Sequence, residues 1–439
     1  MTDPYLRDDP TQVEVCFPTG HHDFITEKSY YDQTPSVTQA SEAIPVIPPK
    51  ASTELTLGEA TAGGQGRHLG LFTTTMLITG RVIGTGIFSA PVTILSETGS
   101  VGATMCLYAL GALFSFAGMG VYLELGTMFP RSGGERVYLE AAFRKPRMLA
   151  TIFFSTQAIL FAFTAQGCIL FATNALAAAE RKASDWEQRG IAIAVICFVT
   201  LLHGLLPNTG VRLMNALSLI KVLLLATICV IGWVILAGGT HVQDSHASFR
   251  DAFAGSSTVP YSYVAALVKV MNTYSGWNNA FLVLGEVRDP VRTIKRAGPL
   301  GLGICVVLYQ FAVVAFFSVG TKEELIKSGT TVGSYFFGKL FGHTAQRVFA
   351  VFVALSSLSN VASTVFAQAR VNQELAKEGA LPWPGLFASN WPTQRSPLAG
   401  LLVHLVPNLI ILLAPPYDVT FRTNGPRFWR DVQGYPTQV

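Results

Sequence analysis

Between residues 70 and 414 long apolar runs recur along the chain, and they leave few folds open to it. A helix needs roughly 20 mostly apolar residues to cross the hydrocarbon core of a bilayer. Nine runs are predicted to be membrane spans, at 70–97, 101–128, 149–178, 189–206, 211–238, 260–286, 298–319, 345–369 and 398–414. Only 13% of the residues are charged, against about a quarter in soluble domains. The sequence therefore predicts an all-α membrane protein, and its net charge of +4 gives no reason to expect a nucleic-acid partner.

Polar segments flank the apolar region on both sides. Residues 1–66 lack the apolar core of a signal peptide, and we predict that they form a disordered tail. The membrane domain is predicted to cover 67–414, and 415–439 to form a polar C-terminal segment. With the tail in the cytoplasm, the cytoplasmic loops hold about twice as many Lys and Arg residues as the opposite loops, which agrees with the positive-inside rule. We expect a multi-pass protein embedded in a lipid bilayer, with a cytoplasmic N-terminus.

Two of the predicted spans are interrupted by residues that break helices. Gly84-Thr85-Gly86 interrupts the first run, and Tyr274-Ser275-Gly276-Trp277 interrupts the sixth. An unpaired backbone N–H or C=O group in hydrocarbon costs roughly 2–7 kcal/mol by transfer measures. Irregular backbone therefore persists at this depth only where it is buried in protein or lines a cavity. Broken helices in corresponding places indicate the binding site of a transporter.

The interrupted spans are the first and the sixth, five apart along the chain. This spacing predicts a repeat of five helices followed by an inverted copy, with both first helices broken. Four spans are visible in the second copy, and the residues after Pro415-Pro416 are too polar to form another. We therefore expect the second repeat to lack its last helix because the sequence is truncated or mis-spliced, with a natural short product as the alternative.

Three motifs occur in order at matching spans. They are Gly-Arg-Val-Ile-Gly-Thr-Gly-Ile-Phe at 80–88 with Pro91, Pro-Arg-Ser-Gly-Gly-Glu at 130–135 with Tyr-Leu-Glu at 138–140, and Tyr-Ser-Gly-Trp-Asn at 274–278 with Glu-Val-Arg-Asp-Pro at 286–290 and Arg292-Thr293. Together they resemble the amino acid–polyamine–organocation (APC) superfamily, in its L-type amino acid transporter branch. Arg81 and the long tail are similar to the fungal methionine-permease-like members. The resemblance covers about 67–414 and implies a LeuT-like inverted repeat.

This resemblance implies that the two breaks hold a free amino acid. The N–H groups at a helix N-terminus carry partial positive charge, and the carbonyls at a C-terminus carry partial negative charge. Thr85 and Gly86 would bind the carboxylate, and nearby carbonyls would accept from the ammonium. The predicted substrate-binding residues are Val82, Ile83, Gly84, Thr85, Gly86, Asn272, Tyr274, Ser275, Gly276 and Trp277. The alternative is that the glycines only allow close helix packing.

Lys221 lies in the middle of the fifth span, far from either membrane interface. A central lysine costs about 2.5–3.5 kcal/mol on insertion scales, so it is expected to face protein or a cavity. By resemblance, Lys221 takes the place of a sodium ion in related sodium-driven transporters. Two roles stay open for it, a proton carrier that couples proton movement to transport and a permanently charged strut.

Charged residues near the breaks are candidate gates. Arg81 precedes the first break, and its expected acidic partner is Glu124 or Glu286. The predicted inner gate consists of Arg81 and a cluster after the sixth span, Glu286, Arg288, Asp289 and Arg292. The alternative for the cluster is an ordinary solvated loop.

These observations predict a secondary active permease of the plasma membrane. It would import neutral L-amino acids, with methionine a candidate, by alternating access and with a proton. No enzyme activity, cofactor or metal is expected, because the sequence has no phosphate-binding loop, catalytic triad or paired-cysteine motif. By resemblance to animal relatives, a disulfide-linked heavy chain would need a cysteine in the loop at 179–188, which has none. The alternatives are a non-transporting amino acid sensor and an inactive truncated permease.

Overall fold

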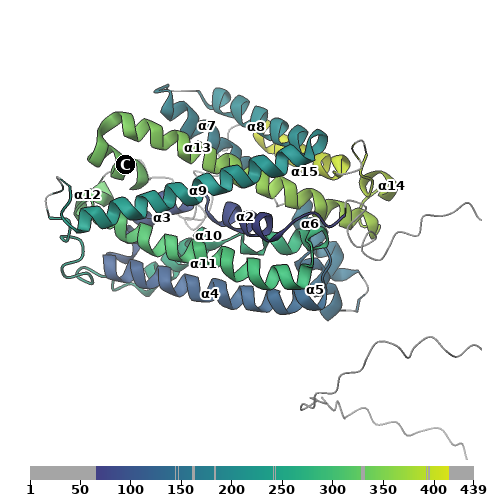
Figure 1. Cartoon of the computed structure of the whole chain (residues 1–439), viewed down its shortest axis with the longest axis horizontal. Helices are drawn as coiled ribbons and strands as arrows, with labels where there is room; N and C mark the ends of the chain where they lie inside the picture. The colour runs from purple at the N-terminus through teal and green to yellow at the C-terminus, as the bar shows by residue number, and fades with distance from the viewer. Residues whose placement is uncertain are drawn as a thin grey trace, which may run out of the picture. The chain divides into compact units, whose positions relative to one another are not determined.

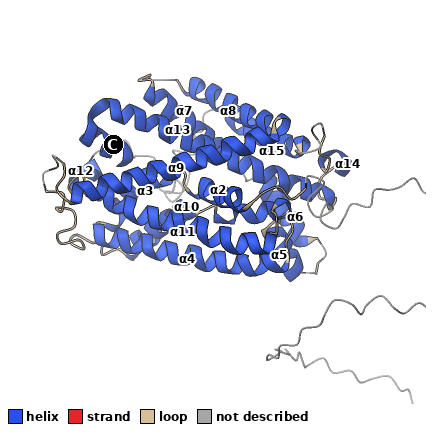
Figure 2. Ribbon diagram, in the orientation of Figure 1, coloured by secondary structure: helices blue, strands red, loops and turns tan. Residues whose placement is uncertain are grey.

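The structure is a computed structural model that describes residues 66–414, apart from 144, 147, 161–163, 182–183, 241, 243, 328–331, 392 and 394–395. Within this part of the chain every regular element is a helix, and no strand occurs (Figure 1; Figure 2). An isolated parallel bridge joins Leu69 to Val287. The predicted all-α class is confirmed. The predicted polar segment at 415–439 and residues 1–65 of the predicted tail lie outside the described residues.

Most of the helices are joined by short connections, and a longer one, residues 237–259, joins α9 to α10. Their bounds are α2 Leu71–Val82, α3 Gly86–Thr98, α4 Val101–Met128, α5 Glu135–Ala142, α6 Leu149–Leu160, α7 Ala165–Ala178, α8 Asp185–Leu205, α9 Pro207–Leu236, α10 Pro260–Tyr274, the 3₁₀ helix η1 Trp277–Glu286, α11 Pro290–Phe317, α12 Lys322–Lys327, α13 Val332–Lys377, α14 Pro384–Phe387 and α15 Leu398–Leu413. Among the described residues, six helical segments are long and apolar enough to cross a membrane: Leu71–Thr98 taken across its break, α4, α8, α9, α11 and α13.

The nine predicted runs all fall on helices, but their boundaries differ from the prediction. The third run is divided between α6 and α7, and the sixth between α10 and η1. The eighth lies inside α13, which is much longer than predicted and bends at Gly342, where φ is +80°. Helices α9, α10 and α11 each begin at a proline, whose fixed φ suits the first helical position. Polar first turns extend α9 and α11 beyond the apolar runs that predicted them.

Buried apolar side chains form two large clusters that meet on α13. The first cluster joins α2, α3, α4, α9, α10, η1 and α11, and the second joins α7, α8 and α15. In Figure 1, α4 and α11 run side by side along one edge, and α7 and α8 lie at the other. Phe366 of α13 belongs to the first cluster and the adjacent Val365 to the second. The described helices therefore form two groups, with α13 as their boundary.

One face of α13 is polar where it meets the first group. Ser356, Asn360, Ser363 and Arg370 recur at helical spacing, so they lie along one side of the helix. The Ser356 hydroxyl donates to the Gly84 carbonyl at 3.5 Å, and the Asn279 amide donates to the Ser363 carbonyl at 3.3 Å. Hydrogen bonds thus join α13 to the first group at the level of the helix breaks, and this contact positions the candidate site.

Candidate functional site

The first break separates α2 from α3. Helix α2 ends at Val82, and Ile83 leaves the helical region with φ −72° and ψ 87°. Helix α3 begins at Gly86, after Thr85, whose side chain makes no capping hydrogen bond. Residues 83–85 are therefore not helical, and the last carbonyls of α2 need partners outside their own helix.

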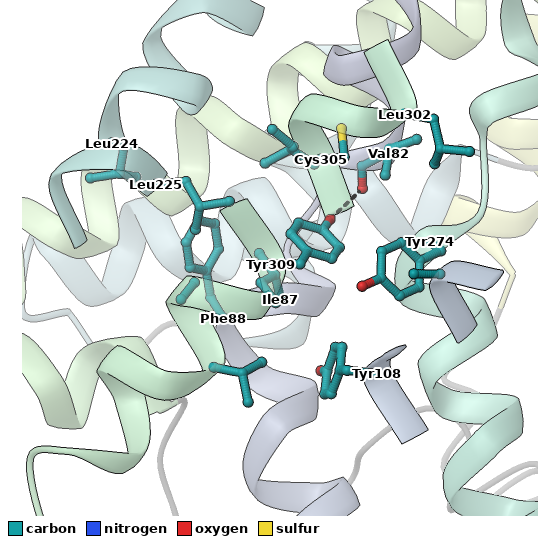
Figure 3. Packing of buried hydrophobic residues seen from close by; sticks show 14 of the residues in the cluster. Val82, Ile87, Phe88, Tyr108, Leu224, Leu225, Tyr274, Leu302, Cys305 and Tyr309 are labelled. Atoms are coloured by element: carbon teal, nitrogen blue, oxygen red, sulfur yellow. Dashed lines mark hydrogen bonds between the residues drawn. The ribbon is translucent and has the colours of Figure 1, made fainter. Parts of the chain in front are cut away.

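Side chains from three other helices supply those partners. The Lys221 ammonium group on α9 donates to the carbonyls of Gly80 at 2.8 Å and Ile83 at 2.6 Å. The Asn360 amide on α13 donates to the Arg81 carbonyl at 2.9 Å, and the Tyr309 hydroxyl on α11 donates to the Val82 carbonyl at 2.9 Å (Figure 3). The carbonyl end of the first break is thus occupied by protein donors.

The second break separates α10 from η1 and is shorter than predicted. Helix α10 continues to Tyr274, Ser275 is extended, and Gly276 has a φ of +104°. A side chain at Gly276 would be strained by this φ and would also collide with Cγ of Arg81. The second break therefore requires glycine at 276, and it lies directly against the side chain of Arg81.

Tyr309 joins the two breaks. Its hydroxyl lies 2.9 Å from the carbonyl oxygen of Val82 and 3.3 Å from that of Thr273 on α10. The ring is fully buried and stacks at a tilt on Tyr274, with ring centroids 5.2 Å apart. Figure 3 shows both rings packed with Tyr108 of α4 beside Val82 and Cys305. One hydroxyl thus fixes the end of α2 relative to the end of α10.

The other side of the first break offers unfilled donors. The backbone N–H groups of Thr85, Gly86 and Ile87 have no hydrogen-bond acceptor among the residues that the structure describes. They open a helix of 13 residues, so the helix dipole adds partial positive charge at the same place. Gly84, Thr85 and Gly86 are partly exposed. This end of the break can therefore bind an anionic group such as a carboxylate.

The structure divides the predicted substrate-binding residues into two sets. Asn272 and Ser275 are exposed, and Gly276 is partly exposed, so a small solute can reach the second break. Tyr274 is fully buried among the aromatic rings of α4 and α11. Trp277 packs edge-on against Tyr122 of α4, with ring centroids 4.9 Å apart. The two aromatic residues thus pack on the α4 side of the second break.

Arg81 does not pair with either acid that the sequence suggested. Its guanidinium group donates to the Asn360 side-chain oxygen at 2.5 Å. Within the described part of the chain it has no carboxylate within ion-pair distance, and this corrects the expected pairing with Glu124 or Glu286. The reason is that the side chain of Arg81 runs from α2 across Gly276 to α13, while Glu286 lies at the far end of η1.

A comparison with protein families identifies the family of this chain. A family model described as amino acid permease matches residues 69–424. The chain belongs to the amino acid permease family. The predicted membership is confirmed, and this family consists of transporters rather than enzymes.

Curated relatives of this chain are amino acid transporters. The high-affinity methionine permease of Saccharomyces cerevisiae is 38% identical over 366 residues, which cover 83% of this chain and 62% of that protein. The b(0,+)-type amino acid transporter 1 of Mus musculus is 29% identical over 328 residues, which cover 71% of this chain and 63% of that protein. The permease thus spans less than two thirds of the length of these relatives.

A solved structure has the same fold. It is Mhp1, a nucleobase-cation-symport-1 family transporter in a closed conformation with bromovinylhydantoin bound, and the TM-score is 0.54. The two share 16% sequence identity, over 80% of this chain and 73% of that one. At this identity the likeness concerns the fold alone.

At the other end of η1, Glu286 of the permease forms a buried cluster with residues that the sequence did not suggest. Its carboxylate accepts from the Arg370 guanidinium at 2.8 Å, and each side chain is 3% exposed. His68 lies 3.6 Å from the other carboxylate oxygen, and the Glu286 carbonyl accepts from the N–H groups of His68 and Leu69. The cluster ties the start of α2 and the end of η1 to α13.

The other predicted gate residues of the permease lie outside this cluster. Arg288, Asp289 and Arg292 are exposed, and among the described residues none of them forms an ion pair. Arg288 donates instead to the Arg67 carbonyl at 3.3 Å. Only Glu286 of the predicted cluster is therefore engaged in a buried charge contact.

Three residues escaped the sequence analysis: Tyr309 and Asn360 at the breaks, and Arg370 in the cluster around Glu286. Asn360 gave a weak signal as a polar residue within an apolar span, since such residues usually face other helices. Arg370 gave none, because it follows the predicted span at 345–369 and falls in the predicted cytoplasmic loop. Tyr309 gave none, because tyrosine is common in membrane helices. Their roles became visible only from the contacts across the fold.

Proposed function

We propose that the permease carries neutral amino acids across the plasma membrane by alternating access, with methionine as the first substrate to test. The observation that carries the proposal is the set of unfilled N–H groups at Thr85, Gly86 and Ile87, beside the second break. Two adjacent breaks of this kind offer fixed dipoles to a zwitterion. The 38% identity to the S. cerevisiae methionine permease supports the substrate class.

In this proposal the amino acid lies between the two breaks. Its carboxylate binds the free N–H groups at the start of α3. Its ammonium group binds the second lone pairs of carbonyls that already accept one hydrogen bond, because a carbonyl oxygen has two lone pairs. The Thr273 carbonyl at the end of α10, which accepts from the Tyr309 hydroxyl at 3.3 Å, suits this role.

Alternating access would move one group of helices against the other. The broken helices belong to the first cluster, and the boundary helix α13 presents its polar face to them. We propose that the fold consists of two inverted five-helix repeats with broken first and sixth spans, and that the two groups of helices rock about this contact. Arg370 and Glu286 would then close the cytoplasmic side, because they join α13 to the end of η1.

We place proton coupling at Lys221. Its ammonium group donates two hydrogen bonds to the end of α2, and each of them joins α9 to α2. Movement of α2 away from α9 would break these bonds. The ammonium group would then release a proton on one side of the membrane, and the neutral amine would take up another proton from the other side. A strut without proton exchange is the alternative that the experiment below separates.

The test is uptake of labelled methionine into proteoliposomes that contain the purified permease, with and without an inward proton gradient. We expect uptake that the gradient accelerates and that other neutral amino acids inhibit. Uptake independent of the gradient would leave Lys221 as a strut. Binding of methionine without uptake would favour a sensor, and neither binding nor uptake of any neutral amino acid would refute the proposal.

Thr85 offers a matched pair of variants for the same assay. Thr85→Pro removes one N–H donor at a position whose φ of −79° already suits proline. Thr85→Ala keeps that donor and removes only the side-chain hydroxyl. We expect the proline variant to lose uptake and the alanine variant to keep most of it. Equal uptake by both variants would show that the carboxylate binds elsewhere.

A further inference from the structure

Two basic side chains lie at the first break without a fixed anion. The Lys221 ammonium and the Arg81 guanidinium both reach the last turn of α2. Within the described residues neither has a carboxylate within ion-pair distance, and their partners are backbone carbonyls and the amide of Asn360. Nearby acids are engaged elsewhere, Glu286 by Arg370 and Glu97 by Lys269. The break therefore carries an excess of positive charge.

Arg81 is held in one orientation by contacts on both sides. Asn360 accepts from the guanidinium group and returns a hydrogen bond to the Arg81 carbonyl at 2.9 Å. The aliphatic part of Arg81 lies over Gly276, where any Cβ would collide with it. The guanidinium is thus fixed between the first break and α13, and its stem lies on the second break.

Asn360 also places this charge close to the free N–H groups. Its side-chain nitrogen lies 3.5 Å from the position that a Cβ on Gly84 would take, one residue before Thr85. A solute bound at the start of α3 therefore has the Arg81–Asn360 pair beside it. Arg81 is only half-buried, so the pair is open to such a solute.

We propose that Arg81 determines the charge selectivity of the permease, by rejecting amino acids with a cationic side chain. The proposal rests on the proposed function, because it concerns the same substrate site. A neutral amino acid brings a carboxylate that the two cations attract and an ammonium group that the carbonyls accept. Lysine or ornithine brings a further positive charge, and in a site shielded from water like charges repel strongly.

The test compares Arg81→Gln, Arg81→Lys and an exposed control, Arg250→Gln, whose side chain is 69% exposed. Each protein is purified, its folding is checked by thermal melting, and leucine and lysine are compared as competitors of labelled methionine binding. In the wild type and in Arg250→Gln we expect lysine to compete at least tenfold less well than leucine. Arg81→Gln should reduce this difference in competition between leucine and lysine by tenfold or more, about 1.4 kcal/mol. Arg81→Lys, which keeps the positive charge, should preserve the difference.

Several outcomes would overturn the proposal. The first is an unchanged leucine-to-lysine ratio in Arg81→Gln, and the second is a wild type that binds lysine as well as leucine. Loss of all amino acid binding in a correctly folded Arg81→Gln protein would also overturn it, because Arg81 would then hold the substrate carboxylate. A wild-type protein that binds no amino acid would refute the proposed function itself. That result is therefore distinguishable from a failure of the charge-selectivity proposal alone.

Discussion

The carbonyl oxygen of Ile83 lies 2.6 Å from the ammonium nitrogen of Lys221, and this hydrogen bond joins the middle of α9 to the end of α2. The same ammonium group also binds the Gly80 carbonyl, and Lys221 is 2% exposed. A lysine is costly at this depth unless its donors are satisfied. Here the ammonium group donates to carbonyls that the broken helix leaves without intrahelical partners. The same two hydrogen bonds therefore provide acceptors for the lysine and a donor for these carbonyls.

Lys221→Met tests this mutual dependence. The change leaves two buried carbonyls without their donor, and each unsatisfied group costs about 1–3 kcal/mol. We expect a clear loss of thermal stability in detergent and no methionine uptake. The control is Lys327→Met on the exposed helix α12, which should change neither measurement. Wild-type melting and uptake in Lys221→Met would show that the two contacts are dispensable.

Tyr309→Phe removes only the hydroxyl that joins the two breaks. We expect a loss of about 1 kcal/mol of stability and a higher KM for uptake, because the ends of α2 and α10 would no longer be fixed to each other. Tyr108→Phe and Tyr274→Phe are matched controls, since both hydroxyls are buried without a hydrogen-bond partner in the described part of the chain. Thermal melting and uptake kinetics check the prediction, and three equal effects would contradict it.

Gly276→Ala should disable the second break. A non-glycine residue in this left-handed conformation costs about 1–2 kcal/mol, and the new methyl group would also displace the side chain of Arg81. We expect uptake to fall by at least tenfold with delivery to the membrane retained. Gly120→Ala on α4, where a Cβ meets no atom within 4 Å, should be neutral. Normal transport by Gly276→Ala would contradict the prediction, because it would show that the backbone at 275–276 accommodates a side chain.

Glu286→Gln removes the negative charge that faces the buried Arg370 guanidinium. Removing one partner of a buried ion pair typically costs about 3–5 kcal/mol, so we expect a large drop in melting temperature. In the double variant Glu286→Gln with Arg370→Gln no charge is left in the pair, and part of the stability should return. Thermal melting of the wild type, both single variants and the double variant measures the coupling. Additive losses would argue that the two side chains act independently.

The class of fold and the places of both breaks could be predicted from the sequence alone. Length and apolarity locate the spans, and Gly84, Gly86 and Gly276 mark the breaks because glycine within an apolar run signals irregular backbone. The bounds of the breaks could not be predicted as well, since Tyr274 keeps helical geometry in the packed environment of Tyr108 and Tyr309. Packing decided where the helix ended.

The partners of the charged residues were the least predictable part of the site. Arg81 and Asn360 are 279 positions apart, and no local pattern links them. An acidic partner for Arg81 was the natural expectation from charge alone, but Glu286 is buried beside Arg370 instead. Side-chain pairing of this kind depends on how helices far apart in the sequence meet, which periodicity does not encode.

The paired contact between Asn360 and Arg81 has a consequence for how the molecule would move. One amide group binds both the guanidinium and the backbone of the same residue, so α2 cannot slide along α13 while keeping half of the contact. Sliding of α2 along α13 would therefore stretch both hydrogen bonds at the same time. This pair of hydrogen bonds favours two discrete positions of α2 relative to α13 over a continuous range of intermediate positions.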